Sequence, residues 1–186
     1  MKKVISLSIA LACIFFADTA KAEKFGFVND PELAQKSTAL QGLQMQRDKI
    51  LAVLKVDLEK ELEEIIAEKQ KLEEESTKLS KADVGKRLDA IDKSEKDLQA
   101  RAQAAAAELQ KNFVDAVLSF KEKAINPVIK ELAEENDFDA VLNLANTFYV
   151  DEKLNVTEEA IKRINKKMPK LELKKVTLEK SESKSK

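Results

Sequence analysis

The chain has 186 residues, of which 44% are hydrophobic and 36% are charged, with 33 Lys and Arg against 34 Asp and Glu. A net charge of −1 provides no overall positive field, so nucleic acid is not an expected partner. Three Gly, three Pro and no Trp or His argue against a loop-rich fold and favour long helices.

The N-terminal segment has the pattern of a cleaved export signal. Basic residues at 2–3 precede an apolar stretch at 4–17, and Ala20 and Ala22 are small residues at the two positions that a signal peptidase reads. The fourteen-residue apolar stretch is shorter than the ~20 residues that span a bilayer, which argues against a membrane anchor. Cleavage before Glu23 and export of the mature chain are therefore expected.

The single cysteine, Cys13, lies inside this signal. The alternative interpretation, a lipoprotein acylated at Cys13, is disfavoured because the apolar run continues through residues 14–16 and the small-residue site lies further on. Removal of residues 1–22 takes away the thiol, three Lys and one Asp, which leaves a mature chain with a net charge of −3. Without disulfides, this chain must be stabilised by packing or by self-association.

A strand followed by a long helix is expected next. Residues 24–28 are short, aromatic and β-favouring, and Asp30 and Pro31 then provide a cap and a first-turn residue. The helical pattern runs to about Ser80, with a bend expected at Gly42. One apolar face recurs at spacings of three and four: Leu51, Leu54, Leu58, Leu62 and Ile65. A helix of about fifty residues would be ~75 Å long, too long for a compact domain of this size.

A turn is expected at residues 80–85, where Ser80 or Asp83 can cap a second helix. Beyond it one set of positions alternates strictly by four and three: Val84, Leu88, Ile91, Glu95, Leu98, Ala102, Ala105 and Leu109. A seven-residue period predicts a left-handed supercoil against a partner helix. Pairing about the turn places residues 100–107 opposite residues 58–65, so the two helices form an antiparallel hairpin.

The second helix is expected to kink or break at Asn126-Pro127. Residues 138–144 and 148–150 are then predicted strands, joined into a hairpin by a tight connection at Ala145-Asn146. A short helix from Glu158 to Lys167 follows, with Thr157 as its cap. Three short strands need a packed face to persist, so self-association is expected at this end of the molecule.

The C-terminal tail, residues 169–186, contains six Lys and three Glu and ends in Ser and Lys. It is predicted to be disordered, and a role as a membrane or cell-wall tether is disfavoured because its field is weak. The predicted fold class is mainly α with a small β body and a long coiled-coil hairpin. The body comprises 23–30 and 137–168, and the hairpin arm comprises 31–136.

The two ends of the mature chain resemble those of the Skp/OmpH family of periplasmic chaperones. The resemblance rests on Lys24-Phe25-Gly26-Phe27-Val28 before the long helix, and on residues 137–142, 148–151 and 155–161 after it. It covers Lys24 to Met168 and implies a periplasmic homotrimer with a β body and three helical arms around a cavity. Such proteins hold unfolded outer-membrane β-barrel proteins without ATP. The sequence has no P-loop pattern, and no cofactor is expected.

On this resemblance the oligomerisation body comprises Phe25, Phe27, Val28, Val141, Leu142, Phe148, Tyr149 and Val150. Phe113 and Phe120 share one face of the second helix and are the candidates for contact with clients. The alternative is that they pack at the root of the arm, which is favoured because aromatic residues at helical spacing usually fill a core.

Enzymatic and metal-binding functions are not expected. Residues 57–75 contain nine acidic residues and three Lys, but they have no EF-hand pattern and no neighbouring His or Cys, so a solvated helix face is predicted. No nucleophile motif is present. The alternative function is a periplasmic structural or adaptor coiled coil that binds one folded partner. The acidic balance of the chain leaves contact with a membrane surface open.

Overall fold

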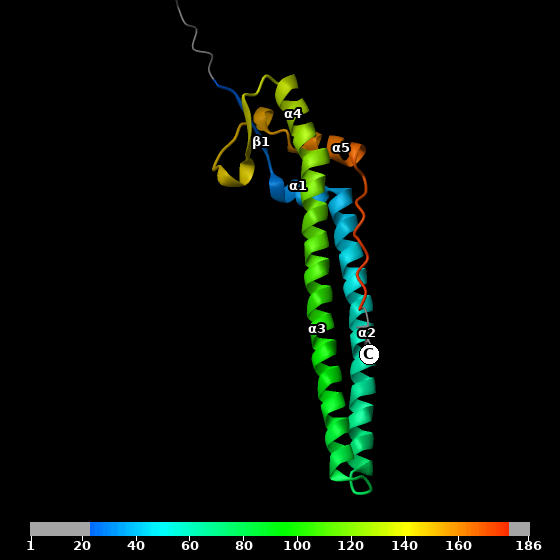
Figure 1. The fold of residues 1–186 in the computed structure, drawn as a ribbon. Coiled ribbons are helices and arrows are strands. Elements are labelled where there is room, and N and C mark those ends of the chain that lie inside the picture. Colours follow the sequence, from blue (N-terminus) through cyan, green and yellow to red (C-terminus); the bar gives the residue numbers. More distant parts are fainter. Residues whose placement is uncertain (1–22, 179–186) are drawn as a thin grey trace, which may run out of the picture.

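The computed structural model describes residues 23–178 and shows a small body from which a long helical hairpin projects (Figure 1). The elements of this range follow the order β1 (Phe25–Val28), α1 (Asp30–Lys36), α2 (Thr38–Glu75), α3 (Lys81–Phe120), a π-helical turn (Lys121–Ile125), α4 (Asn126–Glu135), β2 (Ala140–Asn143) and α5 (Thr157–Lys167). This mainly α architecture with a small β body confirms the predicted fold class. The predicted export signal and the end of the tail, residues 179–186, lie outside the described residues.

The arm is an antiparallel pair of helices, α2 and α3, that run side by side to a tip far from the body (Figure 1). The tip lies at residues 76–80, not at 80–85 as predicted. Ser80 caps α3, because its Oγ accepts from the Asp83 N–H at 3.2 Å and donates to the Asp83 carboxylate at 2.6 Å. Gly85 therefore lies inside α3, where this reciprocal cap holds the first turn.

The two arm helices pack along a narrow apolar seam. Buried residues along it are Leu54 and Leu72 of α2 and Ile91, Leu98, Ala105 and Leu109 of α3. Two members of the predicted α2 face, Leu51 and Leu62, are 45% and 46% exposed and flank the seam. An ion pair between Glu61 and Arg101 confirms the predicted pairing of residues 58–65 with residues 100–107.

The first helix is interrupted at Ser37, not bent at Gly42. Ser37 ends α1 and caps α2, accepting from the Leu40 N–H at 3.4 Å. The Asn165 side chain of α5 pairs with the backbone at this break, because its Oδ1 accepts from the Thr38 N–H at 3.0 Å and its Nδ2 donates to a carbonyl of α1. Gly42 lies within α2. A tertiary contact thus compensates for the lost helical hydrogen bonds.

The starts of α1 and α5 are joined by one polar cluster. Asn29, rather than the predicted Asp30, caps α1. The Asn29 N–H donates to Thr157 Oγ at 2.9 Å, and Thr157 is 1% exposed. Thr157 is the first residue of α5 rather than its cap, and Asn155 Oδ1 accepts from the Thr157 N–H at 3.0 Å. The predicted short helix is present with nearly its predicted bounds.

The helix does not break at Asn126-Pro127. A π-helical turn at Lys121–Ile125 leads directly into α4, with Pro127 in its first turn. A wider turn of this kind accommodates a residue that lacks an N–H donor. Phe120, Ala124 and Val128, spaced by four residues, remain on one buried face across this turn.

The small sheet is parallel and contains β1 and β2, with Phe25 opposite Ala140 and Phe27 opposite Leu142. The predicted hairpin between 138–144 and 148–150 is wrong. Residues 148–150 form no strand, and β2 pairs with the N-terminal strand instead. The pairing follows from the end of α4, which returns the chain beside β1.

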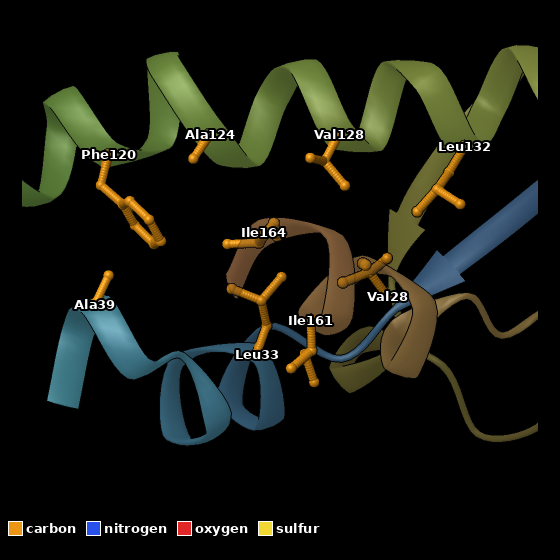
Figure 2. Close-up of a cluster of buried hydrophobic side chains, with 10 residues drawn as sticks. Val28, Leu33, Ala39, Phe120, Ala124, Val128, Leu132, Ile161 and Ile164 are labelled. Atoms are coloured by element: carbon orange, nitrogen blue, oxygen red, sulfur yellow. The ribbon is translucent and has the colours of Figure 1, made fainter. Parts of the chain in front are cut away.

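The body has its own hydrophobic core, which unites segments far apart in sequence. Figure 2 shows Phe120, Ala124, Val128 and Leu132 pointing from one long helix towards α5 and α1. The opposing buried residues are Val28, Leu33, Ala39, Ala160, Ile161 and Ile164. The body therefore includes α1 and α4, although the sequence-based division assigned both helices to the arm.

Part of the predicted disordered tail is structured. Residues 169–178, here named the strap, lie along α2 in an extended conformation (Figure 1). Leu173 is 7% exposed and Val176 is 6% exposed, and both belong to a second core cluster with residues of α2 and α3. The composition of the tail suggested disorder, but its apolar residues find a surface at the root of the arm.

Candidate interaction surfaces

The sheet of the body has one covered face and one open face. Successive side chains of a strand alternate between faces. Val28 and Val141 belong to or pack against the body core, whereas Phe25 and Leu142 are 36% and 44% exposed. A two-stranded sheet is marginal by itself, and parallel sheets normally have both faces covered. The single chain thus presents an incomplete sheet.

Two further aromatic side chains of the body are exposed. Phe148 is fully exposed and Tyr149 is 84% exposed in the loop after β2. Tyr149 also borders an open hollow of ≈ 450 Å³ with Phe25, Phe27 and Val150. Six of the residues predicted for oligomerisation are exposed or half-buried and are here named the body patch: Phe25, Phe27, Leu142, Phe148, Tyr149 and Val150. Val28 and Val141 instead contribute to the core within one chain.

The two aromatic residues proposed for client contact are at the root of the arm. Phe120 is fully buried in the body core (Figure 2). Phe113 is half-buried, and the Arg47 guanidinium carbon lies 5.0 Å from the centre of its ring. This cation–π contact covers the ring within the hairpin. Both side chains thus pack where the arm meets the body.

Other apolar residues along the arm are exposed, and their exposure was not predicted from the sequence. The described residues of α2 and α3 include a set of large apolar side chains that are at least 42% exposed: Met45, Leu51, Val53, Val56, Leu62, Ile66, Leu88, Val114 and Leu118. Val53 and Val56 do not belong to the apolar face predicted for α2. Their position outside that face was the sequence signal for exposure, because an apolar residue outside a packing seam must contact water or a partner.

The arm surface is otherwise dominated by paired charges. Arg101 donates to both carboxylate oxygens of Glu61 and, from Nε, to Asp97 at 2.8 Å. These bonds raise the pKa of Arg101 above its usual value. Nearer the tip, Arg87 contacts Glu75 at 2.7 Å and lowers the pKa of that carboxyl. Within residues 23–178, no group of three acidic, His or Cys side chains is arranged to hold a metal ion.

An apolar groove lies open between the arm helices. Leu58, Leu62 and Ile65 of α2 face Leu98 and Ala102 of α3 around a space of ≈ 330 Å³. The small side chain of Ala102 leaves room beside the larger residues of α2. No described helix is long and apolar enough to cross a membrane.

At the root of the arm, the Gln46 side chain of α2 forms two hydrogen bonds with the backbone of the strap. The Gln46 Nε2 donates to the Leu171 carbonyl at 2.7 Å, and its Oε1 accepts from the Leu173 N–H at 2.9 Å. At the start of the strap, Thr38 Oγ donates to the Pro169 carbonyl at 3.2 Å. The sequence signal for this contact was the presence of four apolar residues in 171–178, which alternate with polar residues on each side of Lys174-Lys175.

Comparison with known proteins places this architecture in a family. Residues 24–164 match the family model described as outer membrane protein (OmpH-like). A crystal structure from Caulobacter crescentus CB15, provisionally assigned as an OmpH-like outer membrane chaperone, has a TM-score of 0.76, and the match covers 84% of this chain and 92% of that one. The 11% identity makes this a likeness of fold. No curated protein matches the sequence. The chain belongs to the OmpH-like outer membrane protein family.

Proposed function

We propose that this protein is an ATP-independent chaperone of the periplasm, which holds unfolded outer-membrane β-barrel proteins between helical arms and prevents their aggregation. The observation that carries the proposal is the set of exposed apolar side chains along an arm that projects away from the body. The family membership and the chaperone description of the Caulobacter crescentus structure support it.

The arm surface suits weak, non-directional contacts. Val53, Val56 and Ile66 are 58%, 62% and 45% exposed and are separated by charged residues. Each apolar contact with a client would contribute little, but several contacts along one arm act together. The charged residues between them keep the free arm soluble. Such a surface retains many sequences without selecting one.

Self-assembly through the body patch would bring several arms around one client. The open face of the β1–β2 sheet, with Phe25, Phe148 and Tyr149, is the apolar surface that this assembly would cover. We place the assembly at three copies on the family resemblance, so that three arms enclose a cavity. The export signal expected at residues 1–22 would deliver the chain to the periplasm.

Aggregation of a diluted client tests the function. The mature protein, residues 23–186, is mixed with a urea-unfolded outer-membrane β-barrel protein, and light scattering is followed after dilution. Suppression is expected at a small molar excess of chaperone. Val53→Ser with Val56→Ser should weaken suppression several-fold, whereas Glu59→Ser with Lys60→Ser, exposed on the same helix, should not. Unchanged aggregation of the client in the presence of the unaltered protein would contradict the proposal. Stoichiometric binding of a single folded partner would also contradict it.

Sedimentation equilibrium of residues 23–186 tests the assembly. A trimeric mass is expected for the unaltered chain and for the control Ala145→Ser with Asn146→Ser, two exposed positions in the loop that precedes the aromatic pair. Phe148→Ser with Tyr149→Ser should shift the mass towards the monomer. If the unaltered chain sediments as a monomer or a dimer, the three-armed assembly is contradicted.

A further inference from the structure

The strap occupies the arm as an extended peptide would. Its apolar side chains are the covered ones: Leu173 and Val176 are buried, and Leu171 and Leu178 are half-buried. Residues 172, 174, 175 and 177 are exposed, so burial alternates on each side of Lys174-Lys175 but not across that pair. The buried side chains join a cluster with Leu43, Ile50 and Leu54 of α2 and with Leu109 of α3. The root of the arm thus has an apolar surface, here named the strap groove, that the four apolar side chains of the strap cover.

The recognition of the strap backbone does not depend on its sequence. The Gln46 amide both donates to the Leu171 carbonyl and accepts from the Leu173 N–H, two residues further along. A neighbouring β-strand would make the same pair of bonds to an extended chain. A carboxamide provides this donor and acceptor together. Any extended segment with apolar residues at alternate positions could make these contacts.

The strap is attached by few interactions and can leave without unfolding the rest. Three hydrogen bonds join it to the arm, through Thr38 and Gln46. None of the ion pairs found among the described residues involves the strap. The ten buried residues of the body core all lie outside the strap, and Leu171 is the one strap residue among the half-buried side chains that pack against them. Such a segment opens locally at a lower free energy than a core element.

We propose that the strap groove is a binding site for extended polypeptide segments with apolar residues at alternate positions, and that the strap is its built-in occupant, displaced by a client segment. The proposal rests on the proposed function for the identity of the client. Membrane β-strands alternate apolar and polar residues, as residues 171–173 and 176–178 do. Because the strap is tethered beside the groove, it competes at a high effective concentration. Client segments with weaker matches would therefore be excluded.

Peptide binding in trans tests the groove without any client. The probe is a fluorescein-labelled peptide with the sequence of residues 169–178, titrated by anisotropy against the full mature chain. In the strap variant, Leu173→Ser with Val176→Ser, the peptide should bind at least ten-fold more tightly than to the unaltered chain. The matched control, Lys174→Ser with Lys175→Ser, changes two exposed neighbours and should bind like the unaltered chain. Adding Gln46→Met to the strap variant should remove most of the gain.

Hydrogen exchange of the unaltered chain tests displacement without any substitution. On saturation with a urea-unfolded outer-membrane β-barrel protein, the Leu173 N–H should lose its bond to Gln46 and exchange at least ten-fold faster. The Ala160 N–H in the body, bonded to the Val156 carbonyl at 2.9 Å, should keep its rate. Unchanged exchange at Leu173 in the saturated complex would overturn displacement.

The two measurements separate this inference from the proposed function. Equal peptide affinity in the strap variant and the unaltered chain would overturn the groove, whether or not the client binds. A ten-fold gain in peptide affinity together with absent client binding would preserve the groove and overturn the chaperone role. Circular dichroism of the strap variant establishes that its helices remain. If they do not, the exchange measurement on the unaltered chain decides the inference.

Discussion

Arg101 of α3 holds the Glu61 carboxylate of α2 in a two-pronged ion pair, with nitrogen–oxygen distances of 3.1 and 2.5 Å. Both side chains are largely buried, with 14% and 19% of their surfaces exposed. Glu61 stands between Leu58 and Ile65 at the spacing of the α2 seam. The pair therefore occupies a position in the hydrophobic interface, where only one pairing of the helices satisfies both charges.

Arg101→Met should destabilise the arm, because it leaves the Glu61 carboxylate partly buried without its strongest partner. The expected loss in the free energy of unfolding is on the order of 2 kcal/mol. The change is read from the urea midpoint. Lys111→Met, which removes an exposed ion pair with Asp115 on the same helix, should cost less than about 0.5 kcal/mol. Equal losses in the two variants would show that the arm does not depend on this pair.

Asn112→Leu should stabilise the protein. Asn112 is 8% exposed, and its amide nitrogen has no hydrogen-bond partner among residues 23–178. Leucine of similar size removes this unpaired donor and adds apolar surface, for an expected gain of about 1 kcal/mol. The urea midpoint should rise with an unchanged slope. The exposed neighbour Gln110→Leu is the control and should leave the midpoint unchanged; a fall for Asn112→Leu would reveal an amide contact made on assembly.

Gly26→Ala should destabilise the body by about 2 kcal/mol, because a Cβ on Gly26 would overlap the Phe138 ring. Gly42→Ala is the matched substitution. A Cβ there meets no atom within 4 Å, and alanine is favoured over glycine inside a helix by about 0.8 kcal/mol. Thermal melting should therefore shift in opposite directions in the two variants. A rise in Tm for Gly26→Ala would contradict the close packing of Phe138 on β1.

Acid should weaken the contact between α4 and α5. Arg163 donates to Glu135 and Glu159 and holds the pKa of both carboxyls below the usual 4.5. A carboxyl with a lowered pKa stabilises the fold above its unfolded value and loses that contribution as the pH falls through the folded value. The Tm difference between the unaltered chain and Arg163→Met should be constant from about pH 7 to pH 5.5, and shrink below about pH 4.5. Lys123→Met, at an exposed cation of the π-helical turn, should show no such change.

The arm was predictable because its fold depends on contacts between residues whose spacing can be read directly from the sequence. Strict four-three spacing from Ile91 to Leu109 identifies the α3 seam, and chain geometry about a turn then determines the partner residues. The error at the tip came from Asp83 and Gly85, which commonly mark turns. Here Asp83 belongs to a cap with Ser80, and the cap draws both residues into the helix.

The body was less predictable because its contacts are between distant segments. β2 could have paired with a following strand, and only the packing of α4, α5 and α1 brings it beside β1. The break at Ser37 likewise depends on Asn165, which lies 128 residues further along the chain. The strap was missed because a Lys-rich composition outweighed the alternation of its apolar residues. The exposed arm residues Val53 and Val56 could have been found by position, since they lie outside the predicted seam.

The helix of the arm continues without a break from α3 through the π-helical turn into α4, so any bend at that turn, which lies in the body, would move the whole arm. From Lys121 to Lys81 the helix extends about 60 Å at its ordinary rise. A rotation of about 5° at that turn would carry the tip through about 5 Å, with helix contacts along the shaft preserved. Small adjustments around Phe120 and Ala124 would therefore displace the tip far more than the body. In the proposed three-armed assembly, the π-helical turn would set the distance between the tips.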